Sequence, residues 1–334
     1  MNALSGRFPA PECFILHLRT FWRTPMRYYF APMEGITTYL YRQLHWKYFK
    51  GVDVYFTPFL SPTMHGPFTP KERKDILPEN NKGIPTVPQI LTNHAEYFYE
   101  VAKELKEYGY KEINLNLGCP SNTVAKKCKG AGFLSETYRL ETFLDAIFEK
   151  SPLPISIKTR IGRYEEEEWE ELLERYNRYP IKELIVHPRV QQDFYKKPIH
   201  WDCFLQSAKS IKSPLCYNGE LHTKEEIKAC KEACPSIQNV MIGRGLLTNP
   251  FLLEQETLTW TKEQKKRFWQ FHDELFEAYY EEIGNNALYK MKELWIYMGK
   301  FFPTVDKSVK KIRKAKNYEE YKIAVEQIQA VCFP

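Results

Sequence analysis

The repeated alternation of short apolar runs with longer amphipathic segments constrains the fold of this chain most strongly. Runs rich in β-branched and aromatic residues recur at 28–32, 54–57, 86–90, 112–116, 155–158, 183–186, 214–217 and 240–242. Segments of helical period lie between them at 95–108, 137–150, 166–179, 201–210 and 224–233. About eight strand–helix units over roughly 220 residues fit a (β/α)8 barrel, so we predict an α/β fold of the TIM-barrel type.

The strand signals stop after Pro250. From Lys262 onward, aromatic and leucine residues recur at helical spacing, and Pro303 separates a last pair of helices. This pattern predicts a small all-helical C-terminal domain at 253–334, following a barrel domain at 27–252.

The first 26 residues show no clear strand or helix period, and we expect them to lie outside the fold. The first 27 residues hold four arginines and one acid, which permits a transit-like extension. The alternative is a stretch translated upstream of the working start. Met26 lies two residues before the first predicted strand and favours this alternative.

Composition excludes some classes and leaves others open. With 43% hydrophobic and 27% charged residues the chain is typical of globular proteins, and no apolar run is long enough to span a membrane. The cysteines lack the spacing of a metal site, so we expect no metal and reduced thiols in the cytoplasm. A net charge of +6 permits an anionic partner without requiring one. A monomer is the default expectation.

One thiol stands at a position suited to chemistry. Residues 112–120 read Glu-Ile-Asn-Leu-Asn-Leu-Gly-Cys-Pro, which places Cys119 just after a predicted strand. Barrel enzymes carry their active sites at the carboxyl ends of the strands. Polar or glycine residues occur at other predicted strand ends too, namely at Pro32-Met33-Glu34, Gln89, Asn116, Lys158-Thr159-Arg160, His187-Pro188-Arg189, Asn218-Gly219-Glu220 and Gly243-Arg244-Gly245.

Each of these residues taken singly has a plain structural explanation, such as a surface ion pair or a satisfied core histidine. Together they predict a ligand at the barrel mouth, because a ring of buried polar groups is costly without partners. Glycines after the last two strands and Arg244 suit a phosphate, while Gln89 and Lys158 suit a planar heterocycle. Flavin mononucleotide (FMN) fits best, and the lack of a G-x-G-x-x-G motif after the first strand disfavours a dinucleotide-binding unit.

With these residues assembled, the chain resembles the tRNA-dihydrouridine synthase family from about Tyr28 to the C-terminal helices. The Asn-x-Gly-Cys-Pro element followed by Gly-Ala-Gly is the most specific part of the resemblance. The similar motifs are Ala31-Pro32-Met33-Glu34-Gly35-Ile36-Thr37, Asn116-Leu117-Gly118-Cys119-Pro120-Ser121, Lys129-Gly130-Ala131-Gly132, Lys158-Thr159-Arg160-Ile161-Gly162, Asn218-Gly219-Glu220 and Ile242-Gly243-Arg244-Gly245.

The resemblance implies an FMN-binding barrel, a helical tRNA-binding domain and NADPH-driven reduction of the C5=C6 bond of particular uridines in tRNA. Cys119 would protonate C5, and Asn116 and Arg189 would contact the substrate. The residues implied to hold the cofactor are Pro32, Met33, Glu34, Gln89, Lys158, His187, Asn218, Gly219, Glu220, Gly243 and Arg244.

The same resemblance changes the interpretation of a basic run at 307–316. An isolated charge run is most simply a solvated helix face, but on a tRNA-binding domain it becomes a surface for phosphate groups. The cations assigned to that surface are Lys307, Lys310, Lys311, Arg313 and Lys314.

Two alternatives remain at this stage. One is another FMN barrel oxidoreductase acting on a free pyrimidine, similar to dihydroorotate dehydrogenase, although a small substrate requires neither the helical domain nor its basic run. The other is a tRNA-binding or chaperone-like protein without catalysis, which would not need the polar strand ends. The sequence does not indicate which uridine is reduced.

Overall fold

The computed structural model describes residues 25–254, 259–302 and 305–332, so almost all of the predicted N-terminal extension lies outside the described residues. Its strands form a closed barrel in chain order, with every neighbouring pair parallel. The strands are β1 (Arg27–Phe30), β2 (Val54–Leu60), β3 (Thr86–Ile90), β4 (Ile113–Leu117), β5 (Ile155–Gly162), β6 (Leu184–Val190), β7 (Leu215–Tyr217) and β8 (Asn239–Ile242). The predicted TIM barrel is confirmed.

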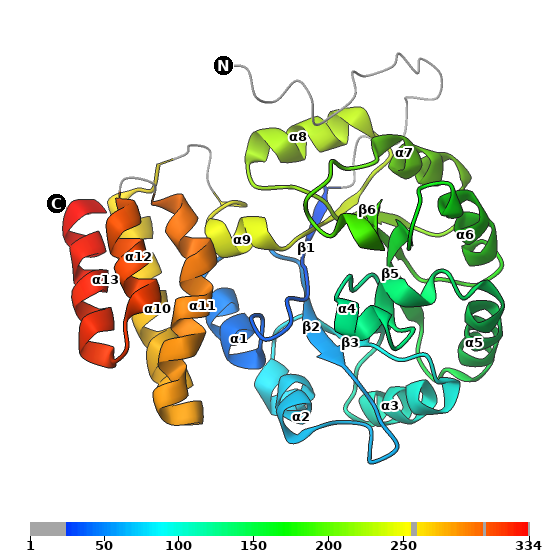
Figure 1. Cartoon of the computed structure of the whole chain (residues 1–334), viewed down its shortest axis with the longest axis horizontal. Coiled ribbons are helices and arrows are strands. Elements are labelled where there is room, and N and C mark those ends of the chain that lie inside the picture. Colours follow the sequence, from blue (N-terminus) through cyan, green and yellow to red (C-terminus); the bar gives the residue numbers. More distant parts are fainter. Residues whose placement is uncertain (1–24, 255–258, 303–304, 333–334) are drawn as a thin grey trace.

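Helices surround the barrel (Figure 1). They are α1 (Tyr39–Tyr48), α2 (Pro70–Ile76), α3 (Ala95–Glu107), α4 (Asn122–Ala125), α5 (Thr137–Lys150), α6 (Glu168–Tyr176), α7 (Trp201–Ser210), α8 (Lys224–Ala233) and α9 (Arg244–Thr248). Helix α8 begins with a capping box in which Thr223 and Glu226 satisfy each other's backbone N–H groups, as their spacing in the sequence suggests.

Strands β5 and β6 are longer than their apolar runs predict. The sequence places their ends at 158 and 186, whereas the strands continue to Gly162 and Val190, which pair with each other. Pairing with a parallel neighbour keeps the polar segments extended after the apolar run has ended. Side chains two residues apart on a strand point to the same face, so Lys158 and Arg160 share one face, as do His187 and Arg189.

The barrel interior holds an apolar cluster and, where β3, β4 and β5 lie side by side, a group of buried polar side chains. A buried cluster joins Tyr29, Ala31, Phe56, Val87, Ile185, Cys216 and Met241. On β3, β4 and β5 the buried side chains include Gln89, Asn114, Asn116 and Ser156 instead. Unpaired polar groups would be costly there, so the hydrogen-bond partners of these four side chains are central to the site.

Four helices complete the described chain: α10 (Lys262–Ile283), α11 (Ala287–Met298), α12 (Asp306–Lys314) and α13 (Tyr318–Cys332). They pack on the side of the barrel formed by α1 and α9 (Figure 1). Phe49 after α1 makes edge contacts with Phe251 and with Phe271 of α10. This confirms a helical C-terminal region, while its treatment as a separate domain with a boundary at 252/253 stays a prediction. Among the described residues no helix has the length and apolar character that a membrane span needs.

Candidate active site at the barrel mouth

The loop after β4 holds Cys119 in a fixed position. The Oδ1 atom of Asn116 accepts hydrogen bonds from the backbone N–H groups of Gly118 (3.0 Å) and Cys119 (2.9 Å). The Cys119 carbonyl accepts from Ala131 N at 3.1 Å. Gly130 adopts a φ of +56°, and a Cβ there would lie 2.9 Å from Cys119 Cβ. A side chain at 130 would therefore displace the loop, which explains why glycine follows Lys129.

The Cys119 thiol is protonated at neutral pH. It is half-buried, and burial raises its pKa above the ordinary value even though Lys158 and Arg160 are close enough to oppose the shift. A thiol of this kind is a weak nucleophile but retains a proton that it can donate. The environment therefore suits an acid rather than a thiolate.

Lys158 and His187 lie on β5 and β6 beside this loop, and burial lowers the pKa of both groups. Burial, followed by the nearby Arg160, lowers the pKa of Lys158 to about 8. Burial and the charges of Arg160, Lys158 and Arg189 lower the pKa of His187 well below its usual range, so its imidazole is neutral. The mouth thus combines a readily deprotonated ammonium with a neutral ring that can donate or accept a hydrogen bond.

Glu220 connects Arg189 on β6 with Arg244, which follows β8. Its Oε1 atom accepts from Arg189 Nη1 at 2.7 Å and from Arg244 Nη2 at 2.6 Å, and His222 Nε2 lies 3.1 Å from Oε2. Burial alone would raise the pKa of Glu220, but the hydrogen bonds from His222 and Arg189 and the charge of Arg244 hold it well below its usual range. The carboxylate therefore stays ionised and orients both guanidinium groups.

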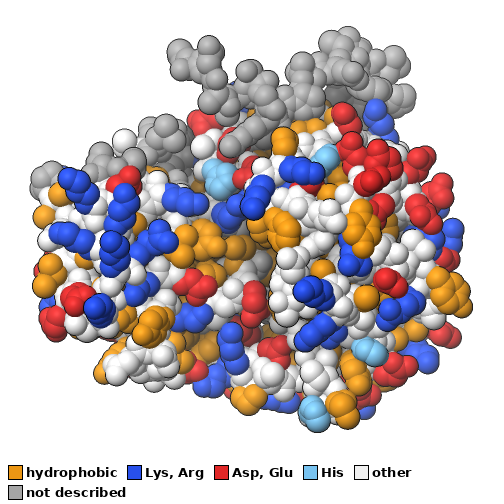
Figure 2. Space-filling view, in the orientation of Figure 1, with side chains coloured by type: hydrophobic (Ala, Val, Ile, Leu, Met, Phe, Trp, Pro, Cys, Tyr) orange, Lys and Arg blue, Asp and Glu red, His pale blue; other side chains and the backbone are white. Residues whose placement is uncertain are grey.

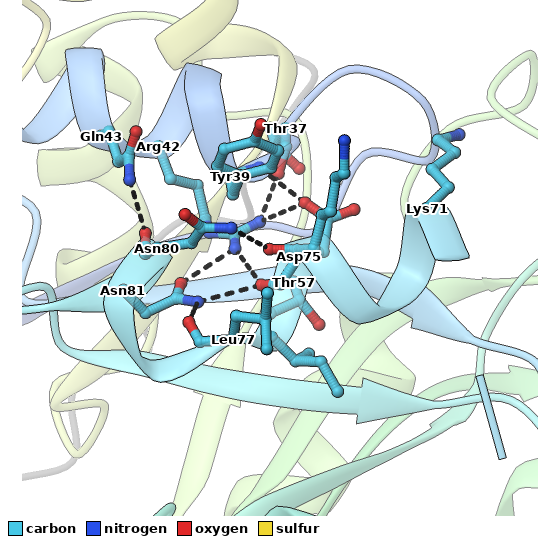
Figure 3. Close-up of polar contacts among 12 residues, drawn as sticks. Thr37, Tyr39, Arg42, Gln43, Thr57, Lys71, Asp75, Leu77, Asn80 and Asn81 are labelled. Carbon is cyan, nitrogen blue, oxygen red and sulfur yellow. Dashed lines mark hydrogen bonds and ion pairs between the residues drawn. The ribbon is translucent and has the colours of Figure 1, made fainter. Parts of the chain in front are cut away.

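The loop after β1 carries Met33 and Glu34 and is held from beneath by a buried cluster. Arg42 of α1 donates to the Thr37 carbonyl (2.8 Å), and its other guanidinium nitrogen reaches the Asp75 carbonyl (2.5 Å) and Asn81 Oδ1 (2.9 Å). Figure 3 shows Arg42 extending toward α2, where Asp75 Oδ1 also accepts from the backbone N–H of Tyr39. A fully buried guanidinium with this many partners fixes the loop to α1 and α2.

The C-terminal region holds the same loop from the other side. Lys290 on α11 donates from Nζ to the Gly35 carbonyl at 2.8 Å and lies 3.2 Å from Glu293. Gly35 has a φ of +71°, in the region that favours glycine. The helical region therefore contributes a direct contact to the rim of the barrel mouth.

Comparison with known proteins assigns the chain to a family. The sequence model described as dihydrouridine synthase (Dus) matches residues 29–332, which is nearly the whole chain. The chain belongs to the dihydrouridine synthase family. A probable tRNA-dihydrouridine synthase of Staphylococcus epidermidis is 30% identical over 269 residues, which cover 78% of this chain and 81% of that protein. A probable tRNA-dihydrouridine synthase 2 of Bacillus subtilis is 27% identical over 271 residues, covering 78% and 82%.

Among solved structures, a variant of morphinone reductase in complex with tetrahydroNAD shares the fold of this chain. The TM-score is 0.51 at 12% identity, over 69% of this chain and 86% of that chain. This likeness concerns the barrel fold alone. The predicted family is confirmed, and membership makes the protein an oxidoreductase.

The structure brings most of the predicted site residues together at one end of the barrel. In Figure 1 the view is onto this end, because α4, which follows the carboxyl end of β4, lies in front of the strands. Gly219 has a packing reason for being glycine, since a Cβ there would lie 2.0 Å from the Tyr217 hydroxyl. The Asn218 amide donates to the Met241 carbonyl at 2.8 Å and thereby ties β7 to β8.

The predicted substrate-binding cations of α12 lie apart from the mouth, on the helical region. Their side chains are exposed, and within the described ranges they form no ion pairs; Lys311 donates to Gln327 at 3.0 Å. Figure 2 shows Lys and Arg side chains gathered over the helical region on the face from which the barrel mouth is viewed. The predicted cations of α12 are Lys307, Lys310, Lys311, Arg313 and Lys314.

Sequence reasoning assigned no role to Arg160 and did not single out Tyr195 or Asn114. Arg160 is buried and donates to the carbonyls of Gly118 (3.1 Å), Val190 (2.8 Å) and Phe194 (2.8 Å). The exposed ring of Tyr195 lies under Arg244, whose guanidinium carbon is 4.5 Å from the ring centre. The two-residue period of β5 could have identified Arg160, because it lies two residues beyond Lys158. No local signal marks the loop position of Tyr195.

Proposed function

We propose that this protein is an FMN-dependent tRNA-dihydrouridine synthase that uses NADPH to reduce the C5=C6 bond of specific uridines in tRNA. The observation that supports this proposal most directly is Cys119. Its thiol is half-buried, keeps its proton because burial raises its pKa, and is held by Asn116 beside Lys158. The names of the similar proteins, probable tRNA-dihydrouridine synthases, support tRNA as the substrate class.

The residues of the mouth fit a flavin mononucleotide. Lys158 supplies a donor to the carbonyl edge of a planar ring, and Met33 lies on the loop that follows β1. Gln89, predicted to hold the same ring, has no exposed surface and bonds to Asn116 instead. Arg244 uses one nitrogen on Glu220, and its remaining N–H groups suit a phosphate. FMN, when bound there in its reduced form, supplies hydride to C6 of the uracil.

The residues of this chain would complete the reduction by providing a proton and a polar surround. In the proposed role Cys119 donates its proton to C5, a general-acid step that typically contributes about 10²–10⁴-fold. Lys158 and Asn116 donate hydrogen bonds to the ring carbonyls, where negative charge develops. Neutral His187 and the cation Arg189 lie on the neighbouring strand to orient the base.

The helical region would bind the tRNA. A uridine must leave its stack before its ring can lie flat in the mouth, so the RNA has to be held firmly outside it. The exposed cations of α12 are suited to phosphate groups, and the exposed ring of Tyr195 under Arg244 offers a stacking surface.

The decisive experiment is to purify the protein, identify any bound flavin and measure NADPH oxidation with and without tRNA. We expect bound FMN, tRNA-dependent oxidation and dihydrouridine in the product. Oxidation stimulated by a free pyrimidine instead would favour the dihydroorotate-dehydrogenase-like alternative. Tight tRNA binding without flavin or turnover would favour a binding protein.

A further inference from the structure

A continuous chain of hydrogen bonds crosses the polar side of the barrel and ends at Cys119. Asn116 Oδ1 accepts from the loop amides, and Asn116 Nδ2 donates to Gln89 Oε1 at 2.7 Å. Gln89 Nε2 donates to Asn114 Oδ1 at 2.7 Å, and Asn114 Nδ2 donates to Ser156 Oγ at 2.9 Å. Ser156 Oγ lies 3.3 Å from the Ile113 carbonyl. Asn114, Gln89 and Ser156 have no exposed surface, and Asn116 is 6% exposed.

Both ends of this chain have fixed roles. The backbone N–H groups of Gly118 and Cys119 can only donate, and the Ile113 carbonyl can only accept. The amide of Asn116 must therefore turn its oxygen to the loop and its nitrogen to Gln89. Gln89 must then turn its oxygen to Asn116 and its nitrogen to Asn114, which orients Asn114 toward Ser156 in the same way. Every link consequently points in one direction, from the Cys119 loop to the start of β4.

This single direction limits what the mouth can offer to a ligand. Asn116 Oδ1 already accepts two N–H groups, which occupies both of its lone pairs. Asn116 Nδ2 uses only one of its two N–H groups on Gln89, so the spare group that Asn116 retains is a donor. Next to Asn116 in the strand register stands Lys158, another donor. A ligand edge at this place must carry an acceptor, such as a carbonyl oxygen or an unprotonated ring nitrogen.

We propose that Asn114 and Ser156 are positioning residues: acting through Gln89, they fix Asn116 as a hydrogen-bond donor and hold the Cys119 loop, so that the mouth selects a ligand edge with an acceptor. Packing needs alone would not place amides here, since the other strands fill the interior with apolar side chains. The proposal rests on the proposed function only for the identity of the ligand.

The test measures alkylation of Cys119 by iodoacetamide in the purified protein without tRNA or NADPH. Cys119 is followed by peptide mass spectrometry, because Cys128 is also half-buried. Asn114→Leu removes the acceptor for Gln89 and loosens the loop, so we expect alkylation to become about tenfold faster, the equivalent of one buried hydrogen bond. Affinity of the flavin-free protein for added FMN should fall by a similar factor.

Three further variants separate positioning from packing. Asn114→Asp keeps an oxygen that accepts from Gln89 but cannot donate to Ser156, so it should accelerate alkylation of Cys119 only about threefold, less than Asn114→Leu does. Ile185→Val changes the apolar side of the same interior and should leave Cys119 unaffected. Ser156→Ala, the gentler change, should accelerate alkylation by about threefold and carries the test if Asn114→Leu does not fold.

The proposal would be overturned if a folded Asn114→Leu or Ser156→Ala protein showed the wild-type rate of Cys119 alkylation and the wild-type affinity for FMN. Equal effects of leucine and aspartate at position 114 would also overturn it. Because neither measurement uses RNA or NADPH, the result is independent of whether the protein reduces uridine. A protein that makes no dihydrouridine but shows this pattern would refute the proposed function alone.

Discussion

The barrel mouth and the outer face of α12 are both rich in cations, but they hold them in opposite ways. In the mouth, Arg160 and Arg189 are buried and donate to carbonyl and carboxylate oxygens at fixed positions. On α12, Lys310 and Lys314 are exposed and form no ion pair within the described part of the chain. A buried guanidinium with several partners fixes geometry, whereas an exposed ammonium mainly contributes to the surrounding potential.

This difference predicts two kinds of defect. Changes in the mouth should alter the chemical step and respond little to salt, because buried interactions are poorly screened. Changes on α12 should alter RNA affinity in a strongly salt-dependent way and leave the chemistry intact. The predictions below test this separation, in order of decreasing effect.

Replacing Cys119 should have the largest effect. Cys119→Ala removes the proposed proton donor and should reduce dihydrouridine formation by at least about 100-fold. The loop is held through backbone groups and the Asn116 side chain, so FMN binding should persist. The measurement is single-turnover formation of dihydrouridine in tRNA, with the flavin spectrum recorded in parallel.

Cys128→Ala is the matched control, because Cys128 is also a half-buried thiol and lies on the same connection between β4 and α5. It should retain activity. If Cys119→Ala turned over tRNA at the wild-type rate, Cys119 could not be the acid.

Replacing the guanidinium group of Arg160 by the single ammonium of lysine should have the next largest effect. Arg160→Lys keeps the charge but cannot reach the three carbonyls of Gly118, Val190 and Phe194 together. The loop of Cys119 and the loop of Tyr195 would lose a common anchor, so we expect kcat to fall about tenfold with unchanged salt dependence. Steady-state kinetics at two salt concentrations tests both parts.

Arg163→Lys provides the comparison, since Arg163 follows β5 and bonds instead to Gly132 and Ser135. A loss of activity in Arg160→Lys that disappeared at low salt would break the proposed division between the mouth and α12.

Charge reversal on α12 should act on binding alone. Lys310→Glu with Lys314→Glu removes two cations from one helix face, and we expect tRNA affinity to fall about tenfold and the salt dependence to become shallower. Filter binding over a range of salt concentrations measures both, and FMN content should not change. Lys228→Glu with Lys231→Glu on the exposed side of α8 is the control and should bind tRNA normally.

A feature of the fold or of the site could be predicted from the sequence when residues close to it in the sequence determine it. The strands and the ring of polar strand ends follow from a two-residue period and from the rule that active sites lie at carboxyl ends of barrel strands. The ends of β5 and β6 could not be predicted in this way, because pairing between Gly162 and Val190 extends both strands. Strand length is set by the neighbour, which an apolar run does not reveal.

The contacts that orient the site are also non-local. Lys290 reaches Gly35 across 255 residues of sequence, and Arg42 reaches Asp75 on another helix. Asn114 looks like one more residue of a predicted strand, and only the neighbouring Gln89 and Ser156 give it a function. Residue types at strand ends could therefore be predicted, whereas the second layer that holds them could not.

Glu183, next to β6, allows the test with the smallest expected effect. It asks whether the hydrogen-bond and ion-pair partners of a buried carboxyl group determine that it is ionised. Glu220 has two arginines and stays ionised, whereas Glu183 accepts hydrogen bonds from Tyr29 and Asn239, and burial raises its pKa to about 7. Because this folded-state pKa lies above the ordinary value of 4.5, its contribution to stability is fully present below about pH 4.5 and is lost as the pH rises through about 7.

Glu183→Gln keeps an oxygen for Tyr29 and Asn239 but cannot ionise, so it should avoid that loss. We expect the difference in melting temperature between the variant and wild type to be about 3 °C more favourable to the variant at pH 8 than at pH 5. Thermal unfolding at both pH values measures the difference. Glu171→Gln is the control, because Glu171 on α6 is exposed, pairs with Arg175 and lies outside the surroundings of Glu183, so this variant should leave the pH dependence of the melting temperature unchanged. An equal shift for Glu183→Gln at both pH values would show that the carboxylate is ionised in the folded protein, and that its burial does not suppress its charge.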